Sequence, residues 1–146
     1  MTVSTMRRQR LGLLVGLALL SAFAWTGFAT AGTATTFNVA NGGFTSWMFD
    51  GVANPPLTLV RGQTYQFALQ DVPSNHPFYI NTINTTGTGS QYTTGVTNNG
   101  ATGNAVVQFT VPMGAPDSLH YNCSNHDAMN GPITVITDGI FAAGFD

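Results

Sequence analysis

The chain has 146 residues, of which 43% are hydrophobic and only 7% are charged, and its formal net charge is −2. Of its four basic side chains, Arg7, Arg8 and Arg10 lie near the N-terminus and only Arg61 lies further along. A nucleic-acid-binding protein needs a basic patch on its folded domain, so this composition excludes nucleic acid as a partner.

The N-terminal segment is typical of an export signal. Three arginines precede an apolar run over about 11–24, and Ala-Thr-Ala at 29–31 matches a small-residue cleavage site. The apolar run is short for a membrane span, so we expect a signal peptide at 1–31, cleaved after Ala31, and no stable membrane span afterwards. The arginine pair leaves the general secretory and the twin-arginine routes both open. The sequence therefore predicts a periplasmic or secreted protein.

Cleavage would change the charge of the remaining chain. Arg61 would be the one basic residue left against six aspartates, which gives a net charge of −5. Such a balance favours a protein partner with a basic docking face. We expect one domain over 32–138, a C-terminal tail over 139–146 with no assigned role, and a monomer.

Short alternating apolar runs, separated by Gly, Pro and Asn, predict an all-β domain, and helical periodicity is absent after the signal. About seven or eight strands in a Greek-key β-sandwich account for these runs. The runs lie around 37–39, 47–49, 57–59, 65–69, 78–80, 107–111, 119–123 and 133–135.

The stretch over 81–104 is long and rich in Thr, Gly and Asn. Tyr92 and Val96 are its expected anchors on the core, and Asn98-Asn99-Gly100 predicts a tight turn. Loops of this length are usually functional or mobile.

The chemistry of the chain is concentrated around its one cysteine, Cys123, which cannot form an internal disulfide. His126 follows three residues later and Met129 three residues after that. A thiolate, an imidazole and a thioether suit copper, and two His, one Cys and a weak axial Met are the ligands of blue-copper electron-transfer sites. We therefore predict one copper ion, held on this loop.

The second imidazole must come from His76 or His120, because the chain has three histidines in all. Strand alternation places Leu119, Tyr121 and Cys123 on one face and His120 on the other. We therefore favour His76, although a histidine before a proline is also a common turn residue. His120 is the competing candidate and is otherwise expected on the surface or between strands.

The segment YNCSNHDAMNGPITV resembles the cupredoxin family of type 1 blue-copper proteins, such as plastocyanins and amicyanins. The matching residues are Tyr121, Cys123, His126, Met129 and Gly131, and the likeness extends over roughly 37–137. It implies a cupredoxin-like sandwich with copper at one end, three ligands on one loop and the fourth on a distant strand.

The resemblance also implies that His126 is where electrons leave, with Phe78, Met113 and Pro132 as its neighbours. The chain departs from many relatives at Pro77 and Asn125, which flank the two histidines. Asn75, before the first histidine, could bond across to the Cys123 loop, and Asp127 adds a negative charge beside it. These differences concern the reduction potential more than the ligand set.

Together these observations predict an exported type 1 copper protein that carries one electron and is not an enzyme. A copper storage or delivery module without redox turnover is the alternative, and a metal-free adhesion or interaction domain is a third possibility. The sequence has no His-x-His pair for a multicopper oxidase and no second cysteine for a binuclear copper site.

Overall fold

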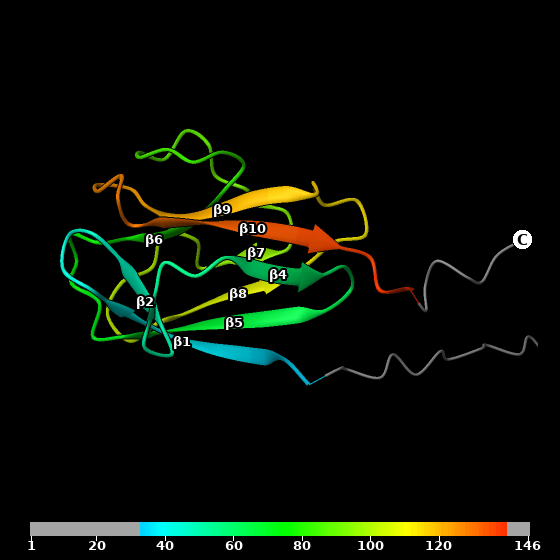
Figure 1. Cartoon of the computed structure of the whole chain (residues 1–146), viewed down its shortest axis with the longest axis horizontal. Helices are drawn as coiled ribbons and strands as arrows, with labels where there is room; N and C mark the ends of the chain where they lie inside the picture. The colour runs from blue at the N-terminus through cyan, green and yellow to red at the C-terminus, as the bar shows by residue number, and fades with distance from the viewer. Residues whose placement is uncertain (1–32, 140–146) are drawn as a thin grey trace, which may run out of the picture. The chain divides into compact units, whose positions relative to one another are not determined.

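Two β-sheets form the part of the chain that the computed structural model describes, residues 33–139 (Figure 1). These residues belong to one compact unit, Ala31–Asp146. The predicted signal peptide, and all of the predicted tail except Gly139, lie outside the described residues. Within residues 33–139, no helix is long and apolar enough to span a bilayer.

The predicted all-β sandwich is confirmed, with ten strands instead of seven or eight. The larger sheet has the order β3-β2-β1-β5-β8-β7 and the smaller sheet β4-β10-β9-β6. The two additional strands, β3 and β7, are two residues long and stand at the edges of the larger sheet. The bounds are β1 Thr35–Asn41, β2 Trp47–Phe49, β3 Val52–Ala53, β4 Leu57–Val60, β5 Thr64–Gln70, β6 Phe78–Asn81, β7 Val96–Thr97, β8 Val106–Thr110, β9 Ser118–Cys123 and β10 Asn130–Ile136.

The core lies between the sheets and is rich in aromatic rings. Alternate residues of β5 and β10 are buried, as the period of a strand requires. Phe49 of one sheet packs on Tyr121 of the other with ring centroids 4.6 Å apart, and Phe67 packs on Phe78 at 5.4 Å. Each such ring stabilises the fold by about 1.5–3 kcal/mol through burial.

The strand register of the smaller sheet determines where the sulfur-rich loop lies. β6 pairs antiparallel with β9, so that Phe78 lies opposite Cys123. β9 then pairs antiparallel with β10, with Asn122 opposite Asn130. His76 precedes Phe78 by two residues, so it lies at the same end of the sheet as the loop between β9 and β10. This loop is at the left end of Figure 1, as is the connection from β1 to β2.

The long segment after β6 is anchored as predicted. Tyr92 and Val96 are partly buried against the core, and the Tyr92 ring packs edge-on against Phe109 at 5.8 Å. The expected turn forms, since the Ala101 amide donates to the Asn98 carbonyl (3.1 Å). Asn99 then binds the backbone of Ile80 as both donor and acceptor.

Arg61 is a buried cation at the turn between β4 and β5, at the opposite end of the sandwich from the β9–β10 loop (Figure 1). Its guanidinium donates to the Val135 carbonyl (3.3 Å) and the Ala115 carbonyl (2.9 Å), and it also pairs with Asp117. The Asp117 side chain is 90% exposed, so water screens this ion pair and the carbonyl bonds matter more.

Arg61→Met is therefore expected to lower the free energy of unfolding by about 2–3 kcal/mol, because buried carbonyls lose their donors. Urea unfolding of the metal-free protein measures this change. Asp117→Asn is the matched control and should cost less than about 1 kcal/mol. Equal losses in the two variants would show that the carboxylate, and not the carbonyl network, gives Arg61 its role.

Candidate metal centre

Backbone hydrogen bonds fold the loop between β9 and β10 into a tight turn. The Cys123 amide donates to the Met129 carbonyl (2.9 Å), and the Met129 amide donates to the His126 carbonyl (3.2 Å). The Asn130 side chain adds a bond to the Asp127 carbonyl (2.6 Å). A loop closed in this way brings Cys123, His126 and Met129 to one end of the sandwich.

Two bonds join this loop to the segment that carries His76. The Asn125 side-chain amide donates to the Asn75 carbonyl (2.8 Å), and the Ser124 amide donates to the Pro77 carbonyl (3.3 Å). Asn75 therefore does contact the Cys123 loop, through its backbone oxygen. The His76 amide itself donates to the Pro73 carbonyl (2.9 Å), within the turn before β6.

The structure brings all four predicted side chains together. The Cys123 Sγ lies 3.6 Å from the His126 Nδ1 and 3.9 Å from the His76 Nδ1, and the His76 Nδ1 lies 3.1 Å from the Met129 sulfur. One donor atom from each of His76, Cys123 and His126 lies within 4.8 Å of the other two. Both histidines present Nδ1 to the sulfur, and their rings lie 4.5 Å apart, tilted by 31°.

The cluster is closed to solvent on most sides. Cys123 and Met129 are fully buried, His76 is 2% exposed, and His126 is half-buried. Burial, and then the nearby His126, lower the pKa of His76 below its ordinary value of 6.5. His76 is therefore neutral near pH 7, which is the form of imidazole that binds metals.

The spacing of these donors fits a metal ion. Two ligands at the usual bond lengths of about 2.0 Å for nitrogen and 2.3 Å for sulfur stand about 3.7 Å apart when the angle between them is 120°. The two sulfur–nitrogen distances of 3.6 and 3.9 Å bracket that value. Thiolate, thioether and imidazole donors without a carboxylate select a soft ion such as copper over magnesium or calcium.

The competing histidine lies elsewhere. His120 is half-buried and opposes Pro132 and Asn81 in the sheet, on the face that strand alternation predicted. Its Nδ1 is buried and has no hydrogen-bond partner among the described residues. It is not part of the cluster.

The expected neighbours of His126 were wrong. Phe78 is fully buried in the core, Met113 lies beside Gly62 at the β4–β5 turn, and Pro132 stands opposite His120 within β10. Besides His76, the ring that contacts His126 is Phe44, from the connection between β1 and β2, at a centroid distance of 5.1 Å. Sequence reasoning missed it, although an aromatic residue directly after a Gly-Gly turn was a usable signal.

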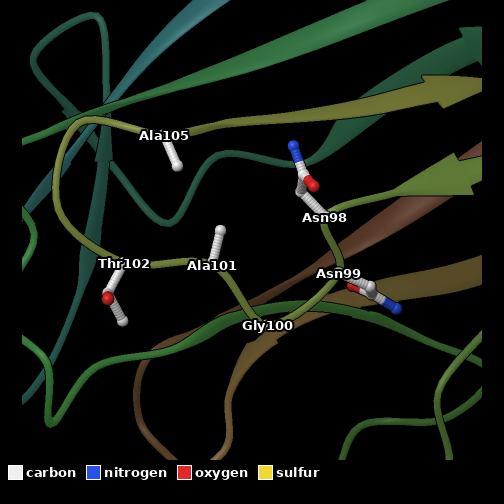
Figure 2. Close-up of a pocket in the computed structure, with 6 residues that line it drawn as sticks. All are labelled: Asn98, Asn99, Gly100, Ala101, Thr102 and Ala105. Atoms are coloured by element: carbon white, nitrogen blue, oxygen red, sulfur yellow. The ribbon is translucent and has the colours of Figure 1, made fainter.

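A separate hollow lies in the loop between β7 and β8, lined by Asn98, Asn99, Gly100, Ala101, Thr102 and Ala105 (Figure 2). The two asparagine side chains diverge, and both amides are already bonded to backbone carbonyls. No member of the metal cluster lines this hollow, and it holds no ionisable group.

Fold and cluster together define a two-sheet β-sandwich with a thiolate, thioether and two-imidazole centre at one end. No protein-family model and no curated protein matches the chain. Among solved structures, it is similar to rusticyanin from Thiobacillus ferrooxidans, with 22% identity and a TM-score of 0.48, over 72% of this chain and 79% of that one.

Reduced rusticyanin gives 22% identity and a TM-score of 0.46, over 72% of this chain and 81% of that one. A mutant of amicyanin in its reduced Cu(I) form gives 14% and 0.45, over 74% of this chain and 87% of that one. Amicyanins are among the proteins that the sequence motif resembles.

Proposed function

We propose that this chain is an exported type 1 copper protein that carries one electron. Cys123, His76 and His126 would hold the ion, with Met129 as the fourth ligand. The observation that carries the proposal is that these side chains, from two segments 47 residues apart, converge on one buried point. Bound copper supplies a one-electron couple between Cu(II) and Cu(I).

The surrounding residues support electron transfer more than chemistry on a substrate. The sulfur of Cys123 accepts a long contact from the Asn125 amide (3.4 Å), which orients it toward the two imidazoles. No carboxylate belongs to the cluster that could serve as an acid or base. A reduced partner would give one electron to the centre, and the centre would then pass that electron to an oxidised partner. No atom would be transferred.

Export from the cytoplasm and the charge of the redox partner are part of the same proposal. The N-terminal segment supports export to the periplasm or the medium, where a lone cysteine bound to metal would be protected from oxidation. The aspartate excess supports a partner with a basic docking face. Asp127, next to His126, is exposed and would contribute to such an encounter.

Titrating the mature protein with Cu(II) tests the proposal. We expect an intense visible absorption band and a reversible one-electron wave in voltammetry. Slow, one-directional transfer of copper to an acceptor, without a reversible wave, would favour the storage or delivery alternative. A colourless titration would overturn the copper proposal itself.

His76→Ala, compared with His120→Ala, tests the ligand from the distant segment. We expect the His76 variant to lack the wild-type band and to lose more than the roughly 10–100-fold of copper affinity that is typical when a residue that only supports a ligand is changed. The His120 variant should keep the wild-type spectrum, because its ring lies outside the cluster. The reverse pattern would make His120 the ligand.

A further inference from the structure

Phe44 is an exposed aromatic residue whose ring lies against both histidines. Its side chain is 64% exposed, and its ring centroid lies 5.5 Å from the His76 ring and 5.1 Å from the His126 ring. A phenylalanine with this much contact with water gains little from burial, so its contribution to the core does not explain its position.

The turn that carries Phe44, residues 42–46, is closely constrained. The Gly42 amide donates to the Ser46 carbonyl (2.9 Å), and the Gly43 amide donates to the Asn41 side chain. Gly43 has a φ of 77°, which glycine adopts without strain, and a Cβ at Gly42 would collide with the Ser46 hydroxyl. We call residues 42–46 the cap turn. Its hydrogen bonds hold the backbone of Phe44 so that the ring lies beside the two histidines.

A single amide side chain joins the cap turn to the metal-binding loop. The Asn54 Nδ2 donates to the Thr45 carbonyl (3.1 Å) and to the Ala128 carbonyl (3.0 Å). Its Oδ1 accepts a hydrogen bond from the Trp47 amide (2.9 Å), at the start of β2. Asn54 itself has a φ of 44°, in the left-handed region that glycine and asparagine adopt more readily than other residues, so an asparagine suits this backbone position.

We propose that Phe44 is a hydrophobic cap of the copper centre and that Asn54 is the residue that positions it. This inference rests on the proposed function. The cap limits the access of water and of competing ligands to Cys123. It also favours Cu(I), because the oxidised centre carries one more positive charge and loses more hydration beneath an apolar cover.

Phe44→Ala and Asn54→Gly test the two roles, since glycine keeps the backbone conformation at position 54 and removes only the amide. In both variants we expect faster alkylation of Cys123 in the metal-free protein. In the copper-loaded protein we expect release of Cu(I) to a chelator to be roughly tenfold faster and the reduction potential to be lower. The double variant should add little to Phe44→Ala if Asn54 acts through the cap.

Met113→Ala is the matched control, because Met113 is 60% exposed and lies at the other end of the sandwich. It should leave the alkylation rate, the release rate and the potential unchanged. An alkylation rate in Phe44→Ala equal to that of the wild type overturns the cap, whether or not copper binds. If copper binds with its intense band but release and potential stay the same in Phe44→Ala, the cap fails and the electron-carrier proposal stands.

Discussion

Cys123→Ser is expected to abolish the intense visible absorption of the copper-loaded protein. The band of a type 1 site arises from charge transfer between the thiolate and Cu(II), and a serine hydroxyl provides no such donor. Cys123 is the one thiol of the chain, so no other residue can replace it. A visible spectrum after copper titration, recorded beside the wild type, measures the loss.

Met129→Leu is the control for this experiment, because it removes the other sulfur of the cluster and conserves the volume of a fully buried side chain. We expect it to keep the band and to change the potential, since a thioether is a weak ligand. A band that survives in Cys123→Ser and disappears in Met129→Leu would contradict the assignment of the thiolate.

The serine variant also separates metal binding from folding. In the wild type, copper at a thousand times its dissociation constant should raise the free energy of unfolding by about 4 kcal/mol. The serine variant should lose most of that increase. Its metal-free form should still fold, because the Asn125 amide that contacts the sulfur can donate to a hydroxyl in the same place.

Alternation of apolar residues was enough to predict the strands that have a buried face. The run from Tyr65 to Leu69 and the one from Ile133 to Val135 lie in β5 and β10, where every second residue is buried. β3 and β7 were not predicted, because an edge strand of two residues is too short to show alternation. The parallel pairing of β1 with β5 and of β4 with β10 also has no signal in alternation, because it depends on the packing of segments that are distant in sequence.

The three cluster residues on the loop between β9 and β10 could be predicted because they lie within seven positions of the sequence. His76 could be reached only by exclusion, since the register that places Phe78 opposite Cys123 is a tertiary property. The contact of Phe44 with the two histidines also depends on tertiary structure, although its place after a Gly-Gly turn was a usable signal. Nothing in the sequence indicates the role of Asn54, because its amide joins two loops that meet only in the folded chain.

Gly131→Ala is expected to have the largest effect on the stability of the metal-free protein. A Cβ at Gly131 would lie 2.7 Å from the Tyr121 Cε1 and closer still to the hydroxyl end of that ring. The ring cannot move aside: it is fully buried, packs on Phe49 at 4.6 Å, and donates its hydroxyl to the Pro55 carbonyl (2.7 Å). Burial also raises the pKa of Tyr121, which keeps this donor protonated.

Such overpacking should lower the free energy of unfolding by about 3 kcal/mol. It should also weaken copper binding, because Met129 is two residues away and the Cys123 amide bonds to its carbonyl. Gly114→Ala is the control, since a Cβ there would meet nothing within 4 Å, and it should change stability by less than about 0.5 kcal/mol. Thermal melts of both variants, recorded with and without copper, measure the changes in stability and in copper binding. If both variants melt like the wild type, the Tyr121 ring does not restrict the size of the side chain at position 131. The close approach of β10 to β9 is then not what holds Met129 beside the cluster.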